Sequence, residues 1–340
     1  MSLNLKPAML DAGLVFSGKP SGTMIHGFES PNEYTPTINP NYDLNVSAAR
    51  DVVVWMLMDR PEPLYLFGPT GCGKSSLVRQ LAARLNYPVF EVNGHERAEL
   101  SDWIGHLTVE NGNMKFVDGP LTQALRYGGL FLLNEIDLCS PSVLAGLNTL
   151  LDGSPLCLEQ NGGELVMPAE SFRFVATANT NGAGDTSGLY QGVIRQNLAF
   201  LDRFLVVQCD YPNPDVELKL LTQCYPALPN KVARGMVNMA TEVRRLFTGK
   251  LNASDPIDTP TVEVTFSTRT LLRWADLALR FKPLAKQGLS PIVYALDRAL
   301  GFRCAPETQV TLHELAQRIF TVVEPLEDAT PSEPSNSQGE

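Results

Sequence analysis

The 340-residue sequence has little that would place it in a membrane. Its longest unbroken apolar run covers only residues 52–58, whereas a membrane-spanning helix needs roughly 20 apolar residues. The N-terminal stretch also lacks a basic segment followed by a long apolar core, so no secretory signal is expected. These absences predict a soluble, cytoplasmic protein with no membrane partner.

Histidine, cysteine and basic residues are scarce as well. The 4 histidines and 6 cysteines include no C-x-x-C pair and no metal-ligand spacing, which argues against zinc and against a disulfide framework. The 27 Lys and Arg face 37 Asp and Glu, a net charge of −10. Because clustered basic residues bind the phosphate backbone, and no basic stretch with interleaved aromatics is present, a nucleic-acid partner is disfavoured.

The pattern that is present changes along the chain and divides it into four parts. Residues 17–45 are rich in Ser, Gly, Pro, Asn and Thr and lack periodicity, so residues 1–45 are predicted to form an extended N-terminal arm. Residues 46–211 alternate helices with short apolar strands, which is typical of a parallel sheet covered on both faces. Residues 212–324 carry only helical signals and predict a small all-α domain, and residues 325–340 predict a disordered acidic tail.

The individual elements follow from the same periodicities. The predicted strands of the sheet are residues 64–67, 88–92, 130–133, 172–176 and 204–207. The predicted helices are residues 46–58, 74–86, 216–221, 231–247, 267–281, 290–300 and 311–323.

Two hairpin signals interrupt this order. Asn111-Gly112 divides residues 107–117 into two short β-like runs, and Asn161-Gly162-Gly163 divides residues 156–167 in the same way. Asn and Gly tolerate the positive φ angles that tight hairpin turns require. Each segment therefore predicts a hairpin.

Residues 68–75, GPTGCGKS, match the phosphate-loop pattern G-x-x-x-x-G-K-[ST]. Glycines let the backbone N–H groups curl around phosphate oxygens, Lys74 brings positive charge to the β and γ phosphates, and Ser75 offers a hydroxyl to Mg²⁺. A strand before the loop and an amphipathic helix after it supply the required context. The loop predicts ATP binding, although it recognises phosphates and does not distinguish ATP from GTP. Its candidate nucleotide-binding residues are Gly68, Pro69, Thr70, Gly71, Cys72, Gly73, Lys74 and Ser75.

The strand at residues 130–133 ends in Asn134 and Glu135. The usual pattern is an apolar strand followed by Asp, which orients the Mg²⁺ shell, and Glu, which polarises the attacking water. Glu135 occupies the general-base position. Asn134 can accept a hydrogen bond from a metal-bound water but adds no charge, so Ser75 and Asn134 are the candidate metal-side residues and Mg²⁺ is expected to bind more weakly.

A longer phrase carries a family resemblance. Residues 172–190, FRFVATANTNGAGDTSGLY, followed by FLDRF at residues 200–204, resemble the MoxR-type AAA+ ATPases. Within that family they look most like the CobS group, the AAA+ subunits of aerobic cobaltochelatases. The resemblance covers residues 20–210 well and is weaker beyond 211. It implies an AAA+ P-loop core followed by a helical lid.

The resemblance also implies roles for five residues. Asn179 matches the sensor 1 residue, which holds the attacking water near the γ-phosphate. Arg203 matches the arginine finger, which reaches the nucleotide of the neighbouring subunit, and Arg195 is a weaker candidate for a second arginine acting in trans. Arg269 matches the sensor 2 residue of the lid, with Arg273 one helical turn further on as the alternative.

At the level of function, the resemblance implies a chaperone-like hexameric ring that uses ATP and Mg²⁺ to remodel a partner protein carrying a von Willebrand factor A domain. The two hairpins fall where the family has inserts that face the pore of the ring. Two alternatives stay open. One is a CobS-type subunit of an ATP-dependent cobaltochelatase, and the other, motivated by Asn134, is a nucleotide-gated ring scaffold with little hydrolysis.

Overall fold

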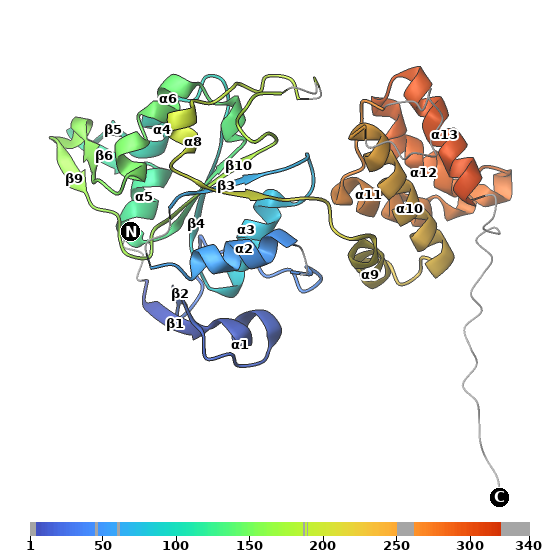
Figure 1. Ribbon diagram of the computed structural model, residues 1–340, viewed down its shortest axis with the longest axis horizontal. Coiled ribbons are helices and arrows are strands. Elements are labelled where there is room, and N and C mark those ends of the chain that lie inside the picture. Colours follow the sequence, from blue (N-terminus) through green and yellow to red (C-terminus); the bar gives the residue numbers. More distant parts are fainter. Residues whose placement is uncertain are drawn as a thin grey trace, which may run out of the picture. The chain divides into compact units, whose positions relative to one another are not determined.

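The computed structural model describes residues 5–44, 47–59, 62–185, 188, 190–249 and 262–320. The chain divides into two compact units, residues 1–213 and 214–340 (Figure 1). The division falls close to the predicted boundary after residue 211. The predicted acidic tail of residues 325–340 lies outside the described residues.

A five-stranded parallel sheet forms the centre of the first unit, with strand order β11-β3-β10-β7-β4 (Figure 1). Every neighbouring pair is parallel, and every residue of β7 and β10 is buried, as expected for a sheet covered on both faces. The predicted α/β fold with a parallel sheet is confirmed. The strands are β3 (Leu64–Phe67), β4 (Val89–Asn93), β7 (Leu130–Asn134), β10 (Arg173–Ala178) and β11 (Leu205–Gln208).

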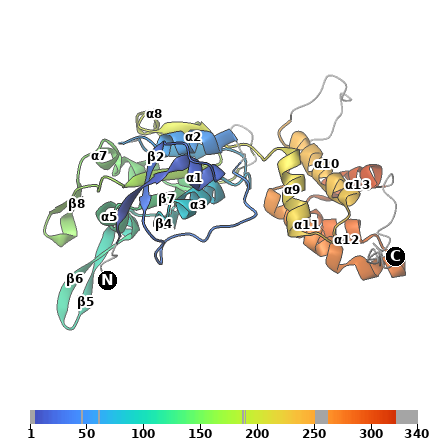
Figure 2. The same ribbon diagram turned by 90° about the horizontal axis from the view of Figure 1, so that it is seen from below.

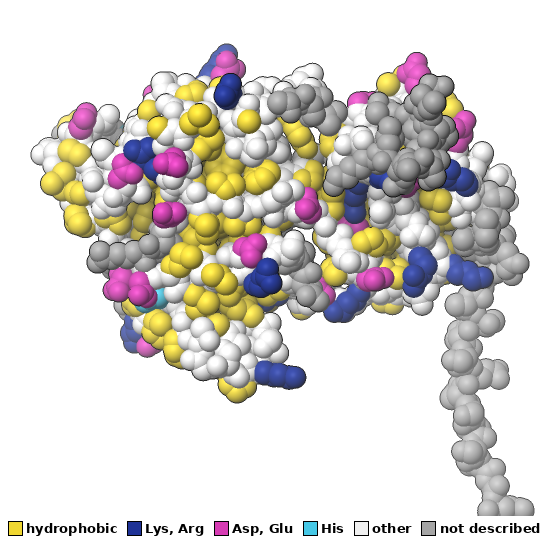
Figure 3. Space-filling view, in the orientation of Figure 1, with side chains coloured by type: hydrophobic (Ala, Val, Ile, Leu, Met, Phe, Trp, Pro, Cys, Tyr) yellow, Lys and Arg dark blue, Asp and Glu magenta, His cyan; other side chains and the backbone are white. Residues whose placement is uncertain are grey.

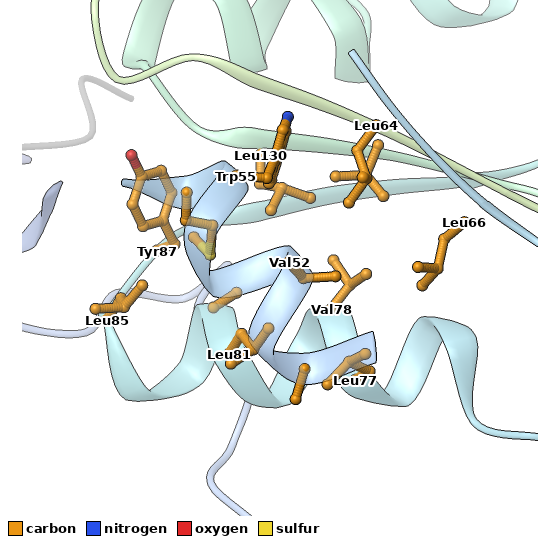
Figure 4. Packing of buried hydrophobic residues seen from close by; sticks show 14 of the residues in the cluster. Val52, Trp55, Leu64, Leu66, Leu77, Val78, Leu81, Leu85, Tyr87 and Leu130 are labelled. Carbon is orange, nitrogen blue, oxygen red and sulfur yellow. The ribbon is translucent and has the colours of Figure 1, made fainter. Parts of the chain in front are cut away.

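Alternate residues of each strand enter two different cores, because successive side chains of a strand point to opposite faces. On one face the strands pack against α2 (Ser47–Met56) and α3 (Lys74–Arg84), and on the other against α5 (Pro120–Tyr127) and smaller elements. Figure 4 shows the first core, to which both helices and the strands β3 and β7 contribute Val52, Trp55, Leu77, Leu81, Leu64, Leu66 and Leu130.

The N-terminal segment differs from the prediction. Strands β1 (Pro7–Asp11) and β2 (Met24–Phe28) pair antiparallel, with α1 (Ala12–Ser17) between them. The expectation of an extended arm over residues 1–45 is therefore wrong for residues 7–28.

Hydrogen bonds within this segment, and one to Leu85, explain the difference. Backbone N–H groups of Ser21, Leu14 and Gly22 donate to the Asp11 carboxylate and hold the pKa of Asp11 below its usual range. The N–H of Phe28 donates to the carbonyl of Leu85 at 3.0 Å. No local periodicity reports such contacts.

Both predicted hairpins are confirmed. Strands β5 (Gly105–Glu110) and β6 (Asn113–Asp118) are joined by Asn111 and Gly112, whose φ angles of 52° and 82° are the positive values the turn requires. Strands β8 (Leu156–Leu158) and β9 (Glu164–Val166) form the second hairpin. The β5–β6 hairpin projects from the unit (Figure 2), and hydrophobic side chains gather where β5, β6 and β9 lie (Figure 3).

Short helical elements complete the first unit. They are α4 (Leu100–Ile104), η1 (Ile136–Leu138), α6 (Pro141–Ala145), α7 (Asn148–Leu151), η2 (Glu159–Asn161) and α8 (Leu198–Leu201).

The described residues of the second unit are helical, as predicted. Trp274 is fully buried at its centre, and its indole N–H donates to the carbonyl of Ile292 at 2.9 Å. None of the helices in the described ranges is long and apolar enough to cross a membrane. The elements are α9 (Pro214–Cys224), α10 (Asn230–Phe247), α11 (Thr268–Arg280), η3 (Lys282–Gln287), α12 (Pro291–Ala299), η4 (Gly301–Arg303) and α13 (Pro306–Phe320).

A buried ion pair ties three of these helices together. Arg244 of α10 donates from Nη1 and Nη2 to the two carboxylate oxygens of Glu217 of α9, at 2.6 and 2.8 Å. The Arg244 Nε donates to the carbonyl of Phe266, and the Thr268 hydroxyl donates to Glu217 at 2.7 Å. The start of α11, where Arg269 lies, is thereby fixed to α9 and α10.

Candidate functional site

The phosphate loop connects the end of β3 to the start of α3. The φ angles of Gly68, Gly71 and Gly73 are 155°, 72° and 100°. Residues with a Cβ atom rarely adopt such values. A Cβ on Gly68 would lie 1.9 Å from the carbonyl oxygen of Cys209. The glycines are therefore required by the backbone path, and the path ends at the positive N-terminus of an 11-residue helix.

The middle of the loop contacts the segments that follow β10 and β11. The Thr70 carbonyl accepts from the Tyr211 hydroxyl at 2.9 Å, and its N–H donates to the Tyr190 hydroxyl at 3.4 Å. Cys72 is buried, and a hydrogen bond from the Cys209 thiol lowers the pKa of Cys72. These contacts brace the loop from outside.

Lys74 and Asn179 come together at the site. The Lys74 Nζ donates to the carbonyls of Gly68 and Pro69 at 2.8 and 3.1 Å, and to the Asn179 Oδ1 at 3.2 Å. Asn179 follows the last residue of β10, and β10 pairs with β3, which leads into the loop. The sheet order therefore brings the loop lysine and the predicted sensor residue to one point.

Ser75 and Asn134 meet beside them. The Ser75 hydroxyl donates to the Asn134 Oδ1 at 2.5 Å, and the Thr177 hydroxyl donates to the same oxygen at 3.1 Å. The Asn134 Nδ2 donates to the Glu91 carboxylate and to the Asn93 Oδ1. Asn134 is 6% exposed, and its amide uses both its donors and its acceptor positions.

Sequence reasoning missed Glu91, Asn93 and Thr177. A signal for the first two exists, because the alternation of β4 places Glu91 and Asn93 on one face of an otherwise apolar strand. Their partner could not be foreseen, since it depends on the β4–β7 register, which sets Asn93 opposite Asn134.

Glu135, the predicted general base, has an unusual backbone. Its φ and ψ are 54° and 42°, in the left-handed region. The other non-glycine residues with positive φ in the described ranges are both asparagines, which tolerate this region better. Such strain costs on the order of 1–3 kcal/mol and concentrates at functional sites. The turn leaves the Glu135 side chain exposed, directly after the buried strand β7.

Asp137 links the segments after β7 and β10, a role that no motif in the sequence indicates. Its Oδ2 accepts from the backbone N–H groups of Asn179 and Thr180 at 2.8 and 3.2 Å. Its Oδ1 is buried without a hydrogen-bond partner in the part of the chain that the structure describes. Burial raises the pKa of Asp137, against these hydrogen bonds. Asp137 therefore fixes the backbone from which Asn179 extends.

Arg203, the predicted arginine finger, is paired within its own chain. Its Nε and Nη2 donate to the Asp152 carboxylate at 2.7 and 3.0 Å, and Nη1 donates to the Ala199 carbonyl. The contact with Asp152 raises the pKa of Arg203. Arg195 is exposed and forms no ion pair with the described residues. An Arg203 that served a neighbouring subunit would have to leave Asp152.

Arg269 and Arg273 belong to the second unit. Both are exposed on α11, four residues apart on one helical face. Their predicted contact with nucleotide crosses the boundary between the two units and stays a prediction.

The residues at the loop fit Mg²⁺ held together with phosphates. The donors present are the Ser75 hydroxyl and the Asn134 amide oxygen, which are hard oxygen ligands of the kind Mg²⁺ prefers. The described ranges hold no group of three or more His, Cys, Asp or Glu that could bind a metal ion. Mg²⁺ typically takes one or two protein ligands and completes its shell with substrate phosphates and water.

Two family models match the chain. Residues 63–204 match the AAA domain of the dynein-related subfamily, and residues 217–319 match the C-terminal region of the CbbQ/NirQ/NorQ proteins. The first match holds the phosphate loop, Glu135, Asn179 and Arg203, and the second holds Arg269.

The chain is also similar to several curated relatives. The aerobic cobaltochelatase subunit CobS of a Sinorhizobium species is 26% identical over 83% of this chain and 84% of its own length. The protein NorQ of Paracoccus denitrificans is 30% identical over 54% of this chain and 65% of its own. Midasin of Dictyostelium discoideum is 31% identical over 71% of this chain, which spans only 4% of that protein.

Proposed function

We propose, from the premise that this chain belongs to the MoxR-type AAA+ ATPases, that it binds ATP with Mg²⁺ at residues 68–75 and hydrolyses it to drive a change in a partner protein. The observation that carries the proposal is the convergence of Lys74, Ser75, Asn134, Glu135 and Asn179 at the carboxyl edge of one sheet. Ligands of open α/β sheets bind at this edge.

The binding part of the proposal rests on the loop. Lys74 already contacts two loop carbonyls, and its contacts with these neutral acceptors are weaker than contacts with anionic phosphate oxygens. The N-terminus of α3 adds its positive dipole end. Ser75 and Asn134 would hold Mg²⁺, which when bound supplies positive charge to the phosphate oxygens.

The hydrolytic part rests on Glu135 and Asn179. We assign to Glu135 the role of accepting a proton from the attacking water, and to Asn179 the role of orienting that water. The fixed backbone at both residues supports these roles, because Asp137 holds Asn179 and the strained turn presents Glu135 to solvent. Arg269 would contact the nucleotide from the helical unit.

The assembly part goes further. We propose a hexameric ring in which Arg203 leaves Asp152 and reaches the nucleotide of the next subunit, where its planar fork suits phosphate oxygens. The exposed apolar residues of the two hairpins, among them Val109, Met114 and Leu165, would face the pore. The partner would carry a von Willebrand factor A domain.

The names of the relatives differ in the process they serve. This supports a shared ATPase that acts on different partner proteins. They include a cobaltochelatase subunit and a denitrification regulatory protein, NirQ of Pseudomonas aeruginosa, which is 29% identical over 54% of this chain. A cobaltochelatase role is therefore the second candidate function, supported by the CobS match along most of both chains.

Turnover of ATP by the purified chain tests the proposal. We expect hydrolysis that requires Mg²⁺, that stops in EDTA and that does not respond to DNA or RNA. If the wild type shows no turnover with or without a partner, while Asn134→Asp does, the proposal that ATP hydrolysis drives a partner is wrong. The nucleotide-gated scaffold is then the better description. Stimulation by a cobaltochelatase large subunit, but not by a von Willebrand factor A protein, would select the chelatase role.

A further inference from the structure

The Asn134 amide is held in one orientation by its neighbours. An ionised carboxylate such as that of Glu91 only accepts hydrogen bonds, whereas a primary amide has one donor end and one acceptor end. The Nδ2 of Asn134 must therefore face Glu91. Its Oδ1 must then face Ser75 and Thr177, whose hydroxyls both donate to it.

Glu91 is itself fixed by an arginine. Arg79 donates from Nε to the Glu91 Oε2 at 2.8 Å and from Nη2 to Oε1. Arg79 lies four residues after Ser75 on α3, so both side chains leave the same face of that helix. The contacts form a closed ring. It runs from Ser75 to Asn134, Glu91 and Arg79, and α3 connects Arg79 back to Ser75.

This ring of contacts explains why position 134 holds asparagine where the usual pattern has aspartate. An aspartate there would place a second carboxylate within hydrogen-bond distance of Glu91, and two such charges repel. With asparagine, Glu91 carries the negative charge, and the amide presents a neutral oxygen to the Ser75 hydroxyl. Asn134 and Glu91 are thus complementary, because the amide donates a hydrogen bond to the carboxylate and adds no second charge.

We propose that Glu91, anchored by Arg79, is a positioning residue for the metal side of the site: it fixes the Asn134 amide oxygen toward Ser75 and so sets the Mg²⁺ dependence of nucleotide binding. The inference rests on the proposed function, because it assumes that Mg²⁺ and a nucleoside triphosphate bind at Ser75.

An exchange of the two groups tests the inference. The readout is the ratio of the Kd for a fluorescent ATP analogue in EDTA to its Kd in Mg²⁺, measured on the full chain. The variants are Glu91→Gln, Asn134→Asp and the double variant, which restores one amide and one carboxylate in swapped positions. Glu96→Gln is the matched control, because Glu96 is exposed just beyond β4.

We expect the ratio to fall about tenfold in Glu91→Gln, the size typical of losing an outer-shell partner of a metal ligand. Asn134→Asp should also lower the ratio, because two carboxylates then compete for one space. The double variant should return to within about threefold of the wild type, and Glu96→Gln should match the wild type. An unchanged Kd in EDTA shows that each variant keeps its phosphate loop folded.

Two results would overturn the inference while leaving the proposed function in place. One is a wild-type ratio in Glu91→Gln. The other is an Asn134→Asp ratio as high as that of the double variant, which would mean that the added charge alone decides Mg²⁺ binding. A wild type that binds no nucleotide, or binds it without regard to Mg²⁺, would instead remove the proposed function itself.

Discussion

The two units of this chain each contain a glutamate paired with an arginine through two contacts, yet the pairs have different surroundings. Arg244 and Glu217 in the helical unit have side chains that are 8% and 0% exposed. Arg79 and Glu91 at the edge of the sheet are 46% and 25% exposed. The first pair contacts backbone and a helix terminus, and the second contacts Asn134 of the site.

The difference separates structural from functional use of the same chemistry. A buried pair cannot lose one member cheaply, because the remaining charge stays out of water. An exposed pair can lose one member at little cost, because water replaces the missing partner. Such pairs contribute about 0–1 kcal/mol to the free energy of unfolding. We therefore expect the Arg244 pair to determine stability and the Arg79 pair to determine what Asn134 presents to its neighbours.

Breaking the buried pair should have the largest effect on stability. Arg244→Met leaves the Glu217 carboxylate buried without its cation and should destabilise the helical unit by about 3–5 kcal/mol. Hydrogen exchange of the backbone amides of α10 and α11, measured on the full chain, reports this loss locally.

The double variant Arg244→Met, Glu217→Leu supplies the control. Since it removes both charges, it should recover most of the stability that the single variant loses. If Arg244→Met lowers the free energy of unfolding by less than about 1 kcal/mol, the buried pair contributes no more to stability than an exposed pair does.

Breaking the exposed pair should show the reverse pattern. Arg79→Gln frees Glu91 without discharging it, so the unfolding free energy should change by no more than about 1 kcal/mol. The Mg²⁺ dependence of ATP affinity should fall by about threefold, less than in a variant of Glu91 itself. A large loss of stability with unchanged Mg²⁺ dependence would reverse the assignment.

Asp137 extends the comparison to a buried carboxylate with no ion-pair partner among the described residues. Its folded pKa is raised by burial above the unfolded value of 3.8. A raised folded pKa means that its stabilising contribution is present below pH 3.8 and is lost as pH rises through the folded pKa.

Asp137→Asn cannot ionise, so it should gain stability relative to the wild type as pH rises from below 3.8 toward neutrality. Denaturant unfolding of both proteins across this range measures the difference. A difference that stays constant with pH, or that grows in favour of the wild type, would contradict the assigned direction.

Features encoded locally could be predicted from the sequence. The phosphate loop, the five strands and the Asn111-Gly112 turn each depend on neighbouring residues, because glycine φ angles and apolar runs are properties of a short segment. The position of Glu135 followed from its place after a buried strand in the same way.

Features created by contacts between distant segments could not be predicted. The pairing of β1 with β2, the contact of Glu91 with Asn134 and the capture of Arg203 by Asp152 all need a register or a packing that no local pattern reports. The same limit applies to Asp137, whose partners lie more than 40 residues away.

The central claim is that Glu135 acts in hydrolysis at a site that binds nucleotide without it. The most direct test measures ATP affinity and ATP turnover on the same preparation of Glu135→Gln. We predict an affinity close to that of the wild type and a turnover lower by about 10²–10⁴-fold, the usual contribution of a general base. Turnover equal to that of the wild type would contradict the account.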